Sequence, residues 1–115
     1  MTKLEQGDIY FIEFGSSKGH EYKKTRPAIV LTSQDNSKTS NMFTCVPLSS
    51  KLSTKFPDDI IIKKDSINNL MSDSLIKMHH LTACDLSMRI KKYIGKVTPD
   101  KLDEIKQTLK KMFSI

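Results

Sequence analysis

The sequence has no long apolar run, and this absence limits the classes of protein it can belong to. No stretch of its 115 residues approaches the roughly 20 apolar residues of a membrane-spanning helix. The first residues, 1–6, lack the apolar run that a secretory signal carries. We therefore expect a single domain, 1–115, that works in the cytoplasm without membrane contact.

Cysteine is also scarce, since Cys45 and Cys84 are the only two and lie far apart in the chain. A domain of this length can bury enough surface to fold without disulfides or metal. We expect two reduced thiols at or near the core. The adjacent pair His79–His80 would point to opposite faces of a strand and chelate poorly, so we predict no metal and no cofactor.

Arginine is rare among the basic residues. Of 19 lysines and arginines only Arg26 and Arg89 are arginine, while the formal net charge is +6. A basic surplus favours a polyanionic partner, although a general bias toward lysine would give the same surplus. A chain that defaults to lysine keeps arginine where a planar, always-charged group matters, which draws attention to both positions.

Several motifs of well-known enzyme classes are missing from the sequence. It contains no glycine pattern of a phosphate-binding loop, no nucleophile elbow and no carboxylates paired at helical spacing. Any chemistry must come from isolated polar residues in loops and at strand ends.

The apolar pattern predicts short strands followed by one helix. We expect strands over 8–14, 27–32, 42–48, 58–63, 74–81 and 90–97, the last interrupted by Gly95. Thr98 and Pro99 then form a helix start, followed by an apolar stripe at Leu102, Ile105, Leu109 and Met112. The expected fold is mainly β, a small curved antiparallel barrel with a packed C-terminal helix.

One polar segment combines residues suited to acid–base and phosphate chemistry. His20, Glu21 and Arg26 lie within seven residues, next to the expected strand at 27–32. Histidine titrates near neutrality, and arginine can stabilise charge that grows on phosphate oxygens. The alternative is structural, with Glu21 paired to a neighbouring lysine and His20 in solvent.

An ordered set of short motifs resembles the MazF/PemK/Kid family of toxins over almost the whole chain. Each motif alone is weak, and their common order makes the resemblance specific. The motifs are Gly7-Asp8-Ile9-Tyr10, Gly19-His20-Glu21, Arg26-Pro27-Ala28-Ile29-Val30-Leu31, Val46-Pro47-Leu48-Ser49-Ser50, Asp73-Ser74, Cys84-Asp85 and Gly95-Lys96-Val97.

The resemblance implies an SH3-like barrel of the type shared by MazF, PemK and CcdB, assembled as a homodimer. It implies a metal-independent endoribonuclease that cuts single-stranded mRNA at short sequences and so inhibits translation. The expected reaction is attack of a ribose 2′-hydroxyl on the adjacent phosphate, which leaves a 2′,3′-cyclic phosphate and a 5′-hydroxyl. A MazE- or PemI-like protein antitoxin is the implied partner.

The same resemblance suggests roles for individual residues. Arg26 matches the family's catalytic arginine, and Ser49 stands where a catalytic threonine is usual. His20 matches an assisting histidine of the Kid branch, Lys77 falls at its acid arginine and His79 at its base aspartate. Thr82 departs from the pattern by replacing an arginine. The residues expected to contact RNA are Glu21, Lys18, Lys23, Lys24, Ser50, Lys51 and His80.

Two other functions remain open at this point. A CcdB-like toxin would bind gyrase without cutting RNA, and the set Gly19-His20-Glu21, Arg26 and Ser49 favours the nuclease over it. A degenerate member that only binds RNA is conceivable because of Thr82.

Overall fold

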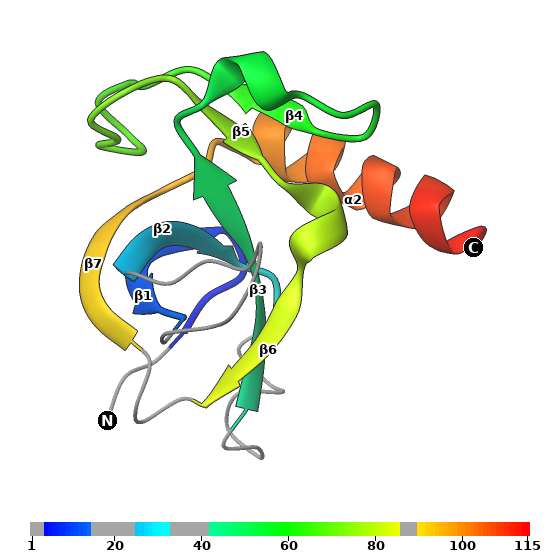
Figure 1. The fold of residues 1–115 in the computed structure, drawn as a ribbon. Helices are drawn as coiled ribbons and strands as arrows, with labels where there is room; N and C mark the ends of the chain where they lie inside the picture. Colours follow the sequence, from blue (N-terminus) through cyan, green and yellow to red (C-terminus); the bar gives the residue numbers. More distant parts are fainter. Residues whose placement is uncertain (1–3, 15–24, 33–41, 86–89) are drawn as a thin grey trace.

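The computed structural model describes residues 4–14, 25–32, 42–85 and 90–115. Within these ranges, a strongly curved antiparallel sheet precedes one long helix (Figure 1). This confirms the predicted mainly β fold with a C-terminal helix, although the sheet is open rather than closed. The elements are β1 (Asp8–Glu13), β2 (Thr25–Val30), β3 (Met42–Ser49), η1 (Leu52–Thr54), β4 (Ile60–Ile62), β5 (Ser74–Ile76), η2 (Met78–His80), β6 (Thr82–Asp85), β7 (Ile90–Lys96) and α2 (Pro99–Phe113).

Strand β3 is the central element of the sheet, whose order is β4-β5-β3-β2-β1-β7 with β6 also on β3. One edge of β3 pairs with β2, with Val46 opposite Ile29. Along its other edge, β3 pairs first with β6 and then with β5, whose Ile76 lies opposite Leu48. Strand β3 therefore joins two parts of the sheet, the curved part made of β7, β1 and β2 and the part made of β4 and β5.

The segment 74–81 is a strand only at its beginning, so the prediction of one strand across this range is wrong in its second half. The Lys77 amide donates to the Pro47 carbonyl at 3.0 Å, and Thr82 lies opposite Cys45. Only Val46 lies between these two positions on β3, so the chain from 78 to 81 has more residues than the ladder can accept. The surplus forms the turn η2, and the strand after it, β6, was not predicted.

Strand β7 continues through Gly95, which lies opposite Ile9, so the predicted interruption is wrong. The pairing of β7 with β1 shifts register twice, between Ile9 and Tyr10 and between Phe11 and Ile12. Such irregularities bend a strand and increase its twist, which accounts for the curvature of this part of the sheet in Figure 1.

Both faces of the curved sheet are covered, because alternate residues of its strands supply two separate cores. Ile9, Ile29 and Val46 belong to the core that α2 covers, where Ile105 is fully buried and Leu102, Leu109 and Met112 pack beside it. This confirms the predicted helix stripe. The other core lies on the opposite face of the same strands, and its buried residues are Leu4, Tyr10, Ile12, Ala28, Val30, Phe43, Cys45 and Cys84.

The two cysteines are buried, free and neighbours in this second core, with 3.8 Å between their Sγ atoms. The contact with Cys84, together with burial, raises the pKa of the Cys45 thiol. Both cysteines are therefore free thiols in the core, as the sequence predicted.

Helix α2 begins as predicted. The Thr98 hydroxyl accepts a hydrogen bond from the Lys101 amide, and Pro99 occupies the first helical position. The helix ends at Ser114, whose left-handed backbone lets its amide reach the Lys110 and Lys111 carbonyls.

Candidate functional site

A cleft of about 540 Å³ opens between the curved strands β1, β2 and β7 and the loop that joins β4 to β5. Its wall combines cationic, hydroxyl and apolar groups on elements far apart in the sequence. The residues that define its chemistry are Arg26, Ser50, Ser74, Met71, Lys92 and Tyr93.

Arg26 is the predicted catalytic residue that lies in this cleft. It is the second residue of β2 and is opposite Ile12 of β1. Arg26 is half-buried, and the Nε atom of its side chain is buried. The inner part of the side chain is therefore held in place on the paired strand. The pairing of β2 with β3 ends where Ala28 lies opposite Pro47. Arg26 and Ser49 lie beyond that end, where Arg26 is opposite Ile12 and Ser49 is opposite Leu75 of β5.

Ser49 and Ser50 differ in their surroundings. Ser49 ends β3 and is 7 % exposed, and its hydroxyl accepts the Lys51 amide at 3.2 Å. Ser50 is exposed and lines the cleft together with Arg26. Of these two serines, Ser50 is therefore the one that lines the cleft, and the sequence had assigned it only to RNA contact. Lys51, its exposed neighbour, does not line this cleft.

Lys77 lies in the interior, away from the lining of this cleft. Its residue is 4 % exposed, and its ammonium group forms an ion pair with the buried Asp59 carboxylate. The ammonium also donates to the Thr54 carbonyl at 3.1 Å and lies 4.4 Å from the centre of the Phe56 ring. These contacts give Lys77 a structural function, joining β5 to the segment before β4.

His79 and His80 lie in the turn η2, not on a strand, so the predicted opposite-face arrangement does not apply to them. His79 Nε2 lies 2.7 Å from Asp58 Oδ2, and Lys111 of α2 lies 2.9 Å from the other oxygen of that carboxylate. These two contacts lower the pKa of Asp58. Desolvation, followed by the charge of Lys77, lowers the pKa of His80. Neither histidine lines the Arg26 cleft.

The rest of the predicted site lies outside the described residues. This applies to His20 and Glu21, which precede β2 in the sequence. Arg89, which the sequence singled out only for its rarity, also lies outside the described residues. Three lysines predicted to contact RNA also lie outside the described residues, namely Lys18, Lys23 and Lys24.

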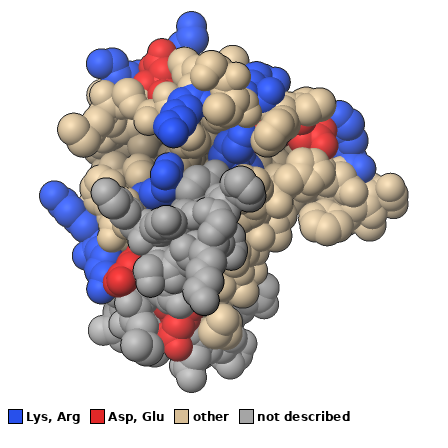
Figure 2. All heavy atoms as spheres, in the orientation of Figure 1, with Lys and Arg blue, Asp and Glu red and all other residues tan. Residues whose placement is uncertain are grey.

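The sequence analysis missed the residues that β7 and the β4–β5 loop bring to the cleft. Lys92 and Tyr93 are a cationic and an aromatic neighbour within a predicted strand, a pattern that could have drawn attention to them. Ser74 belongs to the Asp73-Ser74 motif but was not assigned to the site, and nothing local marks Met71. Figure 2 shows further basic side chains on the edge where β7 lies, and Lys91 and Lys96 are the other exposed lysines of this strand.

Among the described residues, no three His, Cys, Asp or Glu side chains are grouped so that they could hold a metal ion. In the same part of the chain, no helix has both the length and the apolar character needed to span a membrane.

Solved structures of similar fold cover the whole chain. MazF from Deinococcus radiodurans superposes with a TM-score of 0.82 at 18 % sequence identity, covering 100 % of both chains. MazE–MazF from the same organism superposes with a TM-score of 0.77 at 16 % sequence identity, covering 100 % of this chain and 99 % of that one. An endoribonuclease in complex with its cognate antitoxin, from a mycobacterial species, has a TM-score of 0.75 at 16 % sequence identity. The match covers 100 % of this chain and 97 % of that one.

Comparison by sequence gives a family rather than an individual relative. No curated protein matches the chain at the level of sequence. The model of the PemK-like, MazF-like toxins of type II toxin–antitoxin systems matches residues 5–113. Since this match spans nearly the whole sequence, the chain belongs to the PemK-like, MazF-like toxin family.

Proposed function

We propose that this toxin is a metal-independent endoribonuclease that cuts single-stranded mRNA at short specific sequences and thereby inhibits translation. The observation that carries the proposal is the position of Arg26, on a paired strand, in a cleft that Ser50 also lines. Lys92 adds a second cation to the same cleft. A cleft with this charge suits a phosphodiester with flexible, unpaired nucleotides on either side.

In the proposed reaction, the ribose 2′-hydroxyl attacks the adjacent phosphorus, and the 5′-oxygen of the next nucleotide leaves. The products are a 2′,3′-cyclic phosphate and a 5′-hydroxyl. Negative charge grows on the non-bridging oxygens in the transition state, where the guanidinium of Arg26 can bind two of them at once. The hydroxyl of Ser50, which lines the same cleft, can donate a further hydrogen bond, and we keep the predicted catalytic role of Ser49.

Proton transfer to and from the ribose and leaving oxygens needs a base and an acid in addition to Arg26. His20, which precedes β2 in the sequence, keeps its predicted assisting role. His79 remains a second prediction, since Asp58 would hold its imidazole in one orientation. For Lys77 we favour the structural role that its buried partners support, and an acid role remains an untested prediction.

The partners that we propose are RNA, a protein antitoxin and a second copy of the chain. Neighbours in the structural comparison include MazE–MazF and an endoribonuclease in complex with its cognate antitoxin, which supports an antitoxin for this chain. Because mRNA is the proposed substrate, the cytoplasm is the proposed place of action.

The test is cleavage of a long single-stranded RNA by the purified protein, with the ends mapped by primer extension. We expect discrete cuts that persist in excess EDTA. Arg26→Ala should lower the cleavage rate by about 10²–10³-fold, in line with the loss of one transition-state donor. Lys110→Ala removes an exposed positive charge from α2 and serves as the matched control.

Circular dichroism should show that Arg26→Ala keeps the fold. Cleavage by this variant at the wild-type rate would refute the proposed site, and loss of cleavage in EDTA would refute the metal-independent reaction. DNA damage on expression, without loss of RNA, would instead support a toxin that acts on gyrase.

A further inference from the structure

The β4–β5 loop that walls the cleft is held together by its own side chains. Asp65 Oδ1 accepts hydrogen bonds from the Ile67 amide at 2.8 Å and the Asn68 amide at 2.7 Å. In return, Asn68 Oδ1 accepts the amides of Asp65 and Leu70, both at 3.0 Å. With its backbone groups bonded in this way, the loop is a preformed wall.

The same loop is fixed to β7. The Asn69 side-chain amide donates to the Ile94 carbonyl at 2.9 Å, and the Lys96 amide donates to the Ile67 carbonyl at 3.2 Å. Between these bonds the two backbones approach closely at Gly95, where a Cβ atom would lie 2.5 Å from the Ile67 carbonyl oxygen. The loop and β7 therefore form two sides of the cleft at a constant separation.

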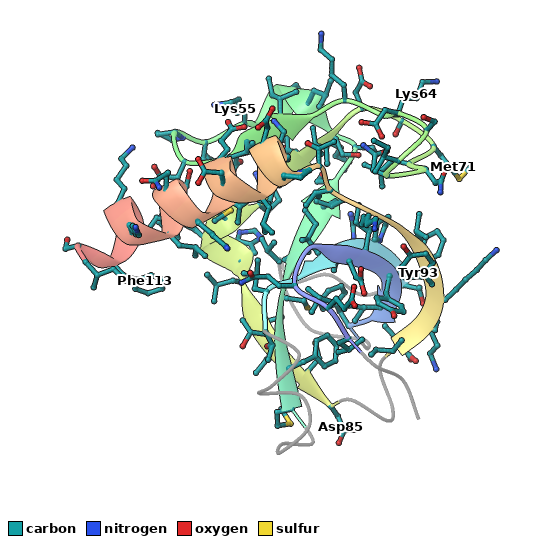
Figure 3. All side chains as sticks on the ribbon, turned by 180° about the vertical axis from the view of Figure 1, so that it is seen from behind. Lys55, Lys64, Met71, Asp85, Tyr93 and Phe113 are labelled. Carbon is teal, nitrogen blue, oxygen red and sulfur yellow. The ribbon has the colours of Figure 1, made fainter. Side chains whose placement is uncertain are left out.

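Each of these two sides brings one exposed large apolar residue to the cleft. Met71 of the loop is 89 % exposed and Tyr93 of β7 is 49 % exposed, and both residues line the cleft. Figure 3 shows them on the same side of the molecule, opposite the end of α2 that carries Phe113. The Tyr93 ring is supported by the ring of Tyr10, with 5.3 Å between the centroids and 74° between the planes.

The surroundings of this apolar pair are cationic. Arg26 and Lys92 line the same cleft. Cations next to an aromatic and a thioether side chain match a nucleotide, which carries its charge on the phosphate and offers a flat, apolar face on the base. A peptide would supply such a flat face only through a chance aromatic residue, so the nucleotide suits the cleft better.

We propose that the cleft holds one unstacked nucleobase beside the phosphate that Arg26 binds. Tyr93 and Met71 contact the base and set which base is accepted, and Lys92 contacts a flanking phosphate. This inference rests on the nuclease function proposed above and adds the residues that determine its sequence preference.

The test compares Tyr93→Ala, Tyr93→Phe and Met71→Ala with Phe113→Ala, a control that truncates an exposed apolar residue far from the cleft. The first measurement is the pattern of cut sites on a long RNA. The second is the affinity for a 2′-O-methyl oligonucleotide of the mapped site, which lacks the attacking hydroxyl and cannot be cut.

We expect Tyr93→Ala to weaken oligonucleotide binding about tenfold and to relax the preference at one position, in line with the loss of one stacked base. Tyr93→Phe should retain the wild-type affinity and pattern, because the ring remains. Replacing the base at that position by an abasic sugar should weaken wild-type binding by a similar factor, with no further loss in Tyr93→Ala.

The outcomes separate this inference from the proposed function. If the wild type cuts RNA but Tyr93→Ala and Met71→Ala leave both affinity and pattern unchanged, the base site is refuted and the nuclease stands. If the wild type cuts no RNA, both proposals fail. An equal loss of affinity in Tyr93→Ala for intact and abasic oligonucleotides would place the ring away from the base and also refute the site.

Discussion

At the scale of single residues, Arg26 and Lys77 show how differently two cations of one chain can be used. Arg26 lines an open cleft with its Nε buried, while Lys77 is enclosed by Asp59, Thr54 and the Phe56 ring. A buried ion pair is costly to break, because removing one partner leaves the other charge without compensation. The two cations should therefore respond to mutation in different ways.

Lys77→Met is expected to lower the free energy of unfolding by about 3 kcal/mol, since Asp59 would be left as an unpaired buried carboxylate. Adding Asp59→Asn should restore part of this loss, because asparagine is neutral and can still accept the Phe56 amide. Urea denaturation measures both variants, and Lys110→Met on the exposed face of α2 is the control. If Lys77→Met alone has the same free energy of unfolding as the control, the structural role of Lys77 is contradicted.

At the scale of elements, the contact between the β4–β5 loop and β7 depends on one position. A methyl group at Gly95 would meet the Ile67 and Asn68 carbonyl oxygens at 2.5 and 2.7 Å, and both are backbone atoms that cannot rotate away. Because the loop and β7 are held together by hydrogen bonds on both sides of this point, they would have to separate to make room.

Gly95→Ala should therefore destabilise the protein by about 2 kcal/mol, within the usual range for overpacking. The amide of Lys96 should also exchange faster with solvent, because its bond to the Ile67 carbonyl would be strained. Lys91→Ala, at an exposed position of the same strand, is the control. If Gly95→Ala has the stability of the wild type, the β4–β5 loop can move away from β7 at little cost, contrary to the contacts described.

The elements also show what the sequence could predict. Strands with clear β-branched runs, such as 8–14 and 42–48, and the capped helix after Thr98 were found because their signals are local. The turn η2 was missed because it arises from the position of Pro47 on another strand, which fixes where the ladder can continue. Pairing partners are a property of the whole sheet, so periodicity within 74–81 could not reveal the break.

The candidate site was predictable to a similar extent. Arg26 stood out by its rarity and its motif, and β2 does place it in a cleft. Tyr93, Met71 and Lys92 reach that cleft only because β7 pairs with β1 and the β4–β5 loop packs on β7. No spacing along the chain encodes such a meeting of distant segments.

At the scale of the whole molecule, three of the described groups, Asp58, His80 and Asp8, make stability depend on pH below neutrality. Hydrogen bonds from His79 and Lys111 lower the pKa of Asp58, so its contribution is present above about pH 4 and is lost as the pH falls through its folded pKa. The pKa of His80 is also lowered, so the unfolded chain takes up this proton first and stability falls as the pH drops below about 6.5. Burial raises the pKa of Asp8, so this carboxyl group has the opposite effect and stabilises the folded protein as the pH falls.

We therefore expect the free energy of unfolding to decrease in two steps between pH 7.5 and pH 3. His80→Gln should remove the step that begins near pH 6.5, and Asp58→Asn should remove the acid step. Urea denaturation at closely spaced pH values tests both, and Asp100→Asn at an exposed position of α2 serves as the control. If the His80→Gln curve runs parallel to that of the wild type, the desolvation of this imidazole has no thermodynamic effect.

The central position of β3 has a consequence for how the molecule comes apart. Its amides are shared among the ladders with β2, β5 and β6, so no single neighbouring strand can detach and expose the whole of it. Local fraying would release the protons of β4 or β7, which border the sheet, long before those of β3. In deuterated buffer, the Val46 and Cys45 amides should therefore exchange only when the entire domain unfolds, and their rates would report its global stability.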